Sequence, residues 1–541
     1  MIAAVASELE EHPSFGLPGG PTLVDLDPET AASRYVEQAL SSASVRSFSI
    51  SSEAAPQTEF KSVGAETIPL TGTVTVKFRQ QMSKIPIYGS LVTVEMDKGN
   101  SLIAMSSSIG TPADVSPVAK ASPAAAAASV KSFGKYKKDL AGITPRLYFY
   151  YHQSTQKWRL VYIFQDVPVT APKSKTKEHF IPRRMDYVVD AHTGKVISEL
   201  PRSAHMAAAN ESAVDGLGVT RTITVETSGK KKTLQDKARN VQTFDFKFKD
   251  PINQARQLPG TVIVNPPKWT PTAVSAHANS EAVADFLRTQ LSRNNIDNKG
   301  GPMNSSINCV VAGQTEGPNV WRNAFWDGRQ MVYGQILFNG SLLSICVDLD
   351  VVAHEMFHGV TDMTSRLEYQ TQSGALNESY SDIFGIIVNN FSKPDTKTWN
   401  WKLGERLNTG GRPFRDMSNP KSLGQPDNMK NYQDLPADEN HDYGGVHINS
   451  GIHNFAAYKI LTALDAAGAA IITPKEAAQI FYLADTQRLS ATSQFADSRR
   501  AVQDSALTLF RTLPVDQRKA KLAAIDDAFD AVGIAGKRVV V

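Results

Sequence analysis

The sequence lacks the features that mark several classes of protein. With two cysteines, Cys309 and Cys346, the chain can form at most one disulfide, and their distance in the fold decides whether they pair or stay buried thiols. No apolar run approaches the roughly 20 residues of a membrane-spanning helix, so we expect no membrane partner. The formal net charge is only +3, which gives no reason to expect nucleic acid as a partner.

The first residues lack the marks of a secretory signal. The apolar stretch at residues 1–6 is shorter than the usual core of about 7 to 15 residues, no basic residue precedes it, and Glu8, Glu10 and Glu11 follow it. Four explanations stay open: a signal removed beforehand, a misassigned start, unconventional export, or an intracellular protein.

Two short segments carry the chemistry. His354 and His358 are four residues apart, so on a helix both imidazoles leave the same face and can reach one metal ion, with Glu355 beside them. Glu378 follows 20 residues after His358, at the start of an apolar run, and offers a third ligand. Asp382, one turn further on, could accept the remaining N–H of a ligating imidazole and fix the orientation of that ring.

This set of side chains has the composition of a hydrolytic metal centre. Two imidazoles and one carboxylate leave a coordination position open for water, and a neighbouring carboxylate can take a proton from that water. The alternative is a pair of surface histidines on an ordinary amphipathic helix, which does not account for the second segment.

In four segments the chain resembles the thermolysin family of zinc endopeptidases. The resemblance runs from about residue 204 to the C-terminus. It implies an α+β fold with a β-rich lobe and a helical C-terminal lobe on either side of a zinc cleft, and an enzyme that hydrolyses protein and peptide substrates. The segments are DVVAHEMFHGVTD (350–362), GALNESYSDIFG (374–385), DYGGVHINSGI (442–452) and NAFW (323–326).

The resemblance also implies a role for each catalytic residue. His354, His358 and Glu378 would hold one catalytic Zn²⁺, and Glu355 would be the general base that activates water. Further residues would stabilise the oxyanion, since neutral or cationic donors are worth most where charge develops in the transition state. These are Tyr369 and His447, with Asp442 holding His447 and favouring its protonated form. For Tyr369 the alternative is a packed surface tyrosine.

Substrate contacts follow from the same resemblance. Arg415 matches the contact to a substrate carbonyl, with an ion-paired loop residue as the alternative, and Asn323 with the Ala324 backbone would pair with an extended peptide. We expect cleavage before Leu, Ile, Phe or Val with broad selectivity, because one methylene in an apolar slot discriminates by only about 1 to 3 kcal/mol. The slot would be lined by Ile345, Val351, Leu403 and the bulky Phe414.

The sequence departs from the family at calcium. Asp350 and Glu405 match two ligands of the double calcium site that the family usually has, but Asn389, Asn400 and Lys402 replace others. Calcium needs several oxygen ligands with enough negative charge, which a lysine reduces. We therefore do not expect the double site, and a single Ca²⁺ stays open.

The N-terminal 200 residues are expected to form an α+β prosegment. A helix at 31–41 precedes alternating strands around 74–78 and 92–96, and a capped alanine-rich helix after Ser122 precedes strands at 146–151, 158–164 and 185–189. The predicted units are a tail (1–20), a fungalysin/thermolysin propeptide module (21–112), a PepSY-like module (113–200), a linker with the processing site (201–213), a β-rich catalytic lobe with the zinc helix (214–365) and a helical lobe (366–541).

The prosegment is expected to inhibit the protease within a monomeric, extracellular zymogen, and a permanent extra domain is the alternative. In the protease we expect a helix near 280–291, with a structural His277 just before it, and four C-terminal helices. Those helices are predicted at 452–466, 474–486, 493–509 and 515–532.

Two rival functions stay open. A pseudo-protease should have lost at least one of Glu355, Tyr369 and His447, all of which are present. A zinc aminopeptidase would need an acidic cluster to bind a free substrate amine, and the sequence shows no such cluster beside the motif.

Overall fold

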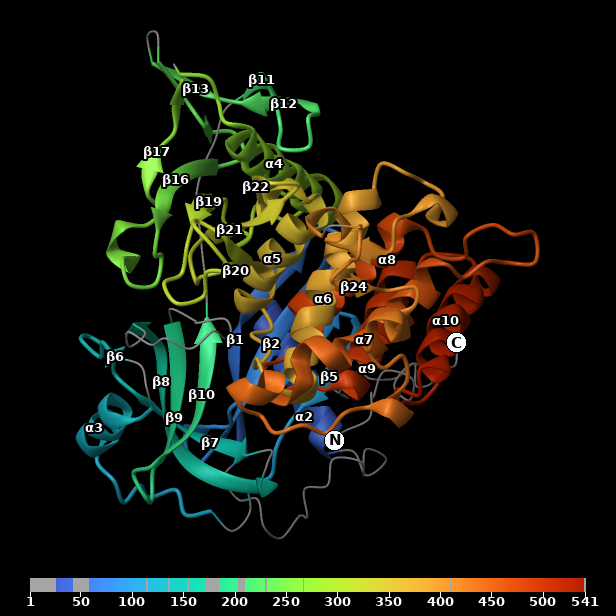
Figure 1. Cartoon of the computed structure of the whole chain (residues 1–541). Helices are drawn as coiled ribbons and strands as arrows, with labels where there is room; N and C mark the ends of the chain where they lie inside the picture. The colour runs from blue at the N-terminus through green and yellow to red at the C-terminus, as the bar shows by residue number, and fades with distance from the viewer. Residues whose placement is uncertain are drawn as a thin grey trace.

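The computed structural model describes residues 26–41, 58–112, 115–134, 137–152, 155–170, 184–202, 210–228, 231–265, 267–408 and 410–539. The expected tail (1–20), with its signal-like stretch, and the middle of the expected linker lie outside the described residues. Two N-terminal modules, a β-rich lobe and a helical lobe follow one another along the chain (Figure 1), which confirms the α+β prediction. None of the described helices is long and apolar enough to cross a membrane.

The first module is an antiparallel sheet covered on one face by a helix. Strand order is β1-β2-β4-β5, with β3 beside β2. Alternate apolar residues of β2 and β4, such as Val76 and Val94, pack with Ala32 and Val36 of the helix, as the alternation in sequence predicts. The elements are α2 (Pro28–Ser41), β1 (Thr58–Ile68), β2 (Thr73–Met82), β3 (Ile85–Pro86), β4 (Leu91–Met96) and β5 (Leu102–Ser108).

The second module is another sheet with a helix. Ser122 caps the helix by accepting a hydrogen bond from the Ala125 amide, and Pro123 occupies its first turn. The last strand, β10, pairs with β9 in a hairpin and reaches Arg202, so it extends into the expected linker. The elements are α3 (Pro123–Ser132), β6 (Lys137–Lys138), β7 (Arg146–His152), β8 (Lys157–Thr170), β9 (Arg184–Asp190) and β10 (Val196–Arg202).

The β-rich lobe is built on a mixed sheet of order β15-β16-β19-β21-β20, with β17 beside β16 and β22 beside β21. The strand β11 begins at Asn210, inside the expected linker. The strands are β11 (Asn210–Val214), β12 (Thr220–Thr224), β13 (Glu226–Ser228), β14 (Lys231–Thr233), β15 (Gln235–Asp236), β16 (Val241–Lys249), β17 (Thr261–Val262), β18 (Val264–Asn265), β19 (Met303–Cys309), β20 (Trp321–Trp326), β21 (Met331–Phe338) and β22 (Ser341–Ser344). Cys309 and Cys346 are both buried and not joined in a disulfide.

The helix α4 (Pro271–Leu291) corrects one prediction, because it begins well before residue 280. Thr270 caps it and Pro271 stands in its first turn, yet its first half is made of small and polar residues without apolar periodicity. His277 lies inside the helix and is fully buried, with its ring nitrogens 3.0 Å from Thr243 Oγ1 and 2.9 Å from the Thr224 carbonyl. These contacts and the burial of the ring fit the structural role that was expected for His277.

Two packed helices form the centre of the molecule, α5 (Leu349–Asp362) and α6 (Thr371–Asn390). The rings of Phe357 and Phe384 stack between them with centroids 3.9 Å apart and planes at 7°. The helical lobe then contains α7 (Asp442–Leu461), α8 (Pro474–Leu483), the π-helix η10 (Ala484–Arg488), α9 (Phe495–Phe510) and α10 (Val515–Ala531). The helix α7 begins before the predicted residue 452, and α8 gives way to the π-helix before the predicted end at 486.

We expect Phe384→Ala to lower the melting temperature strongly, because it removes a fully packed ring between the two central helices, at a cost of about 3 to 5 kcal/mol of unfolding free energy. The measurement is thermal unfolding in a Glu355→Gln background, which prevents self-digestion if the chain is a protease. Leu464→Ala is the control, since Leu464 is 42% exposed. Equal shifts for both variants would show that the Phe357–Phe384 stack contributes no special stability.

Candidate active site

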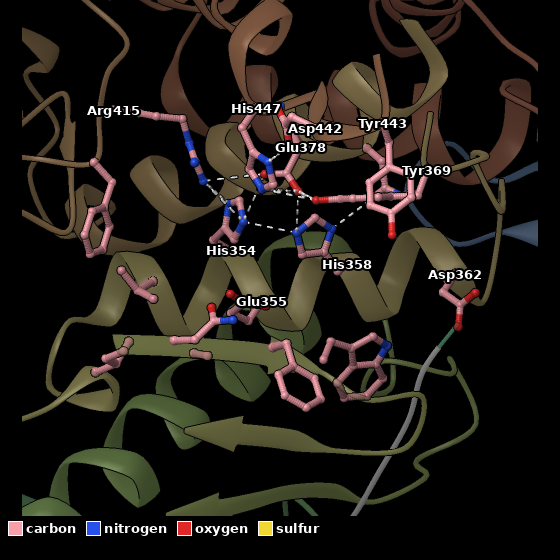
Figure 2. Close-up of a pocket in the computed structure, with 18 of the residues that line it drawn as sticks. His354, Glu355, His358, Asp362, Tyr369, Glu378, Arg415, Asp442, Tyr443 and His447 are labelled. Atoms are coloured by element: carbon pink, nitrogen blue, oxygen red, sulfur yellow. Dashed lines mark hydrogen bonds and ion pairs between the residues drawn. The ribbon is translucent and has the colours of Figure 1, made fainter. Parts of the chain in front are cut away.

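The two motif histidines point toward one place (Figure 2). His354 and His358 lie on successive turns of α5 with their Nε2 atoms 3.1 Å apart. Glu378, on α6, places Oε2 3.5 Å from His354 Nε2 and Oε1 3.3 Å from His358 Nε2. One ligand atom from each residue lies within 4.8 Å of the others, so all three can reach a single ion.

The outer nitrogen of each imidazole is also held. Asp382 Oδ1 lies 2.8 Å from His354 Nδ1, and Asn377 Oδ1 lies 2.7 Å from His358 Nδ1. These contacts fix the ring orientations and leave both Nε2 atoms for a metal ion. The sequence alone assigned no role to Asn377. Its contact depends on the packing of α6 against α5, which spacing along one helix does not reveal.

We call His354, His358 and Glu378 the cradle, and the charges around it favour a bound cation. The Oε2 atom of Glu378 is buried and accepts no hydrogen bond within the described part of the chain. Although burial opposes it, the nearby His447 and His358 hold the pKa of Glu378 well below its usual value. Burial disfavours a charged His358, but Glu378 outweighs burial and raises the pKa of this imidazole to about 9. A buried carboxylate here demands positive charge, which a divalent ion would supply.

Glu355 lies on α5 and faces the cavity beside the two histidines (Figure 2). Burial raises its pKa to about 7, and the neighbouring His358 opposes that rise. A carboxyl group with a pKa near neutrality can both accept and release a proton, which suits a general base.

A second group of polar side chains faces the cradle from the helical lobe. Tyr369 donates a hydrogen bond from its hydroxyl to Glu378 Oε1, and that hydroxyl lies 3.2 Å from His447 Nε2. Asp442 Oδ1 lies 2.6 Å from His447 Nδ1, and Asp442 Oδ2 accepts the His447 amide at 2.8 Å. Desolvation lowers the pKa of His447, but Glu378 and Asp442 outweigh this and raise it. Tyr369 therefore lines the site and is not simply a packed surface side chain.

The backbone before His447 is unusual and places that histidine. Residues 442–445 all have positive φ, at 54°, 49°, 90° and 72°. Non-glycine residues rarely adopt this conformation, and here two glycines share the run with Asp442 and Tyr443. The turn brings the Asp442 side chain back onto His447, so the strain is tied to the orientation of the imidazole.

Arg415 lies beside the cradle and also makes an ion pair. It lies on β24 (Arg415–Asp416), which pairs with β23 (Lys402–Leu403). Its Nε is 2.6 Å from Asp382 Oδ2, and its Nη2 is 3.4 Å from His354 Nε2. Arg415 is thus ion-paired and also lines the cleft, while its contact with a substrate carbonyl stays a prediction.

A cavity of about 1040 Å³ surrounds these groups. Asn323 and Ala324 line it from β20, the edge strand of the sheet, so an extended peptide can add to that edge. The four apolar residues that were expected to line a slot also line this cavity; they are Ile345, Val351, Leu403 and the 38% exposed Phe414. Tyr88 of the first N-terminal module and Leu200 of the second line it as well.

A second carboxylate cluster lies at the start of α5. Asp348, Asp350 and Glu405 have one oxygen each within 4.8 Å of the others. Asn389 and the Gly404 amide donate to Asp350, at 3.1 and 3.2 Å. Both carboxylate oxygens of Asp348 are buried without a hydrogen bond in the described residues. The sequence analysis missed Asp348, although it stands two residues before Asp350.

Comparisons with known proteins agree with this arrangement. The chain matches "Fungalysin/Thermolysin Propeptide Motif" over residues 58–109, "Thermolysin metallopeptidase, catalytic domain" over 211–362, and "Thermolysin metallopeptidase, alpha-helical domain" over 365–534. It is 36% identical over 334 residues to neutral protease NprE of Bacillus pumilus, covering 61% of this chain and 100% of that protein.

Two longer relatives match this chain over different shares of their length. Bacillolysin of Bacillus amyloliquefaciens is 35% identical over 359 residues, and the match spans 65% of this chain but only 62% of that protein. Bacillolysin of Bacillus cereus is 28% identical over 525 residues, which covers 89% of this chain and 86% of that protein. This last match extends into the N-terminal modules.

We expect Asp382→Asn to weaken zinc binding by about 10- to 100-fold, because the Nδ1–H of His354 loses its charged acceptor. Competition with a metal chelator, read by zinc content, measures the affinity. Asp442→Asn is the matched control, since it contacts His447 and no residue of the cradle's ligand set. Unchanged affinity in Asp382→Asn would mean that another group orients His354.

Proposed function

The chain belongs to the thermolysin family of metallopeptidases, as its motifs predicted, and from this we propose that it is a zinc-dependent endopeptidase made as a zymogen. The observation that carries the proposal is the convergence of His354, His358 and Glu378 with Glu355 beside them in a peptide-sized cleft. Two imidazoles and one carboxylate are the ligand set of a catalytic zinc with an open position. A Zn²⁺ ion bound there would polarise the substrate carbonyl and promote ionisation of water.

The protein's own residues would carry the proton and charge movements. Glu355 would take a proton from the attacking water and pass it to the leaving amine, as its pKa near 7 allows. Tyr369 and a protonated His447 would donate hydrogen bonds to the oxygen that gains negative charge in the transition state. Against the effect of burial, Glu378 and Asp442 together raise the pKa of His447, and Asp442 also orients the imidazole. Arg415 would contact a substrate carbonyl from its place beside His354.

Substrate preference would come from the cleft walls. The β20 edge would hold an extended peptide by backbone pairing, and the apolar slot would take the side chain after the scissile bond. Leu, Ile, Phe and Val fit such a slot, and the bulk of Phe414 at its rim favours a limited depth. We infer protein and peptide substrates, a monomeric enzyme and an extracellular location; the PepSY-like character of the second module and the unit boundaries are further proposals of the same kind.

An aminopeptidase is the second candidate because of one observation. The sequence showed no acidic cluster beside the motif, but three carboxylates, those of Asp362, Glu368 and Glu439, line the cavity. Such groups could bind a free substrate amine. Arg366 lines the same cavity and offsets part of their charge. Peptides with blocked and free N-termini distinguish the two activities, because only an endopeptidase cleaves the blocked peptide well.

We expect the linker-processed protein to cleave an N-acetylated peptide with Leu or Phe after the scissile bond, and Glu355→Gln to lower kcat by about 10² to 10⁴ through loss of the general base. Initial rates of both proteins, with chelator and after zinc is restored, give the measurement. Leu464→Ala serves as a surface control. Cleavage that persists in Glu355→Gln would refute the assigned base, and inactivity of a processed, zinc-loaded protein would favour a pseudo-protease.

We also propose that Asp348, Asp350 and Glu405 bind one Ca²⁺. Two of these residues were expected, and the buried oxygens of Asp348 that lack hydrogen bonds fit an oxygen-seeking cation. The Lys402 side chain is exposed, and Asn389 and Asn400 donate hydrogen bonds to Asp350 and Glu405, so only one ion is proposed.

Calcium added to chelator-treated Glu355→Gln protein should raise the melting temperature by several degrees, because a ligand that binds only the folded state stabilises it by mass action. Asp348→Asn should abolish that rise. Asp527→Asn is the control, since the Asp527 side chain is 65% exposed and pairs with Arg538. A calcium effect that survives Asp348→Asn would place the ion elsewhere.

A further inference from the structure

One face of the first prosegment sheet is polar and nevertheless buried. In the β2–β4 register Thr75 lies opposite Glu95, and Lys77 lies opposite Thr93, so these four side chains share a face. This is the face opposite the one that packs on α2. Thr75 and Glu95 are 3% exposed, and Thr93 is 1% exposed. Something polar must therefore cover this face.

The cover is the helical lobe of the protease, at the π-helix η10 and the helix α9. Lys77 Nζ donates to the Thr486 carbonyl at 3.0 Å, and Thr93 Oγ1 donates to the Gln487 carbonyl at 3.2 Å. Arg488 Nη2 lies 2.5 Å from Glu95 Oε2. We call the set Thr486, Gln487, Arg488 and Thr508 the docking surface.

The ion pair at the centre of this contact is buried and makes several hydrogen bonds, although Arg488 Nη1 is buried without a hydrogen bond in the described residues. The side chains of Arg488 and Glu95 are only 3% and 4% exposed. Glu95 also accepts hydrogen bonds from Thr73 Oγ1 at 2.6 Å and from Thr508 Oγ1 at 2.9 Å. Arg488 donates further to Ser505 at 3.1 Å. Removal of one partner from such a pair leaves the other charge buried and uncompensated, which is strongly unfavourable.

The polarity of the contact indicates that it is made to separate. Permanent interfaces resemble a hydrophobic core cut in half, whereas separable ones are more polar. Here the sheet contacts the docking surface through charged and polar groups, while Ile68 at the end of β1 packs in the protease core and Leu70 packs against that core. The charged and polar groups can be hydrated once the two parts separate.

We propose that the docking surface recognises the prosegment by charge, holds it on the protease after the linker is cut, and releases it as a separate body, with the Glu95–Arg488 pair setting how long it stays. This rests on the proposed zymogen function. The docking surface does not line the catalytic cleft, whereas Tyr88 and Leu200 of the prosegment do. Holding the prosegment and blocking the cleft are thus tasks of different residues.

The test measures whether the cut prosegment stays bound. Full-length Glu355→Gln chain is cut in the linker by an added protease, the cut is verified by mass, and co-elution of the two parts is followed by size-exclusion chromatography over a dilution series. Glu95→Gln should raise the dissociation constant at least about a hundredfold, since it strips a buried arginine of its partner. In the double variant Glu95→Gln/Arg488→Gln, the dissociation constant should rise by less than the product of the two factors measured for the single variants.

Matched variants separate recognition from general damage. Asp527→Asn breaks an exposed ion pair on the same lobe and should leave the dissociation constant unchanged. Lys77→Met removes one charged hydrogen bond, keeps the stem of the side chain, and should weaken binding by about tenfold. It decides the question if Glu95→Gln does not fold.

Two results would overturn the proposal: a cut wild-type prosegment that never separates on dilution, or equal dissociation constants for wild type, Glu95→Gln and Lys77→Met. The elution readout needs no catalysis, so it stands apart from the proposed enzyme activity. If the prosegment separates as expected but the protease with Glu355 intact, freed in the same way and loaded with zinc, cleaves no peptide, the enzyme proposal fails and the docking surface stands.

Discussion

The site depends on one constraint, the burial of the Glu378 carboxylate between two packed helices. A buried carboxylate is tolerated only where positive charge or donors surround it. The stacking of Phe357 on Phe384 fixes α5 against α6, and this sets the carboxylate in front of both imidazoles. The same helix contact therefore stabilises the fold and creates the demand for a cation.

The surrounding side chains orient the ligands and balance the charge around Glu378. Asp382 and Asn377 hold the outer nitrogens of the histidines, and Arg415 balances Asp382 from a short strand pair. The turn before His447 has an unfavourable left-handed backbone conformation, and this conformation directs the His447 imidazole toward the same place. These groups come from different parts of the chain, so the site forms only when the two lobes are assembled.

The local sequence pattern was enough to predict the two helices that carry the candidate ligands. The i, i+4 spacing gave His354 and His358, and the apolar run after Glu378 gave the second helix. What the sequence could not reveal were contacts across elements, such as that of Asn377 with His358. It also missed the first half of α4, because those residues are buried by position in the fold although they lack apolar periodicity. The sequence also could not show that Asp362, Glu368 and Glu439, which are far apart along the chain, line one cavity.

The alternation in β2 and β4 was interpreted from one side only. The apolar face identified the sheet, but the intervening threonines, Lys77 and Glu95 would suit solvent equally well, and only the fold shows that they face η10 and α9. The N-terminal modules thus contact the rest of the chain in two regions, at the cavity of the candidate site through Tyr88 and Leu200 and at the docking surface. A second cavity of about 1010 Å³ is lined by residues of the N-terminal modules and of the helical lobe. Because the docking surface lies outside the linker and the cleft, cutting the linker removes none of its bonds. In the proposed release of the prosegment, cleavage of the linker and separation of the two parts are therefore two events, and the polar contact governs the second.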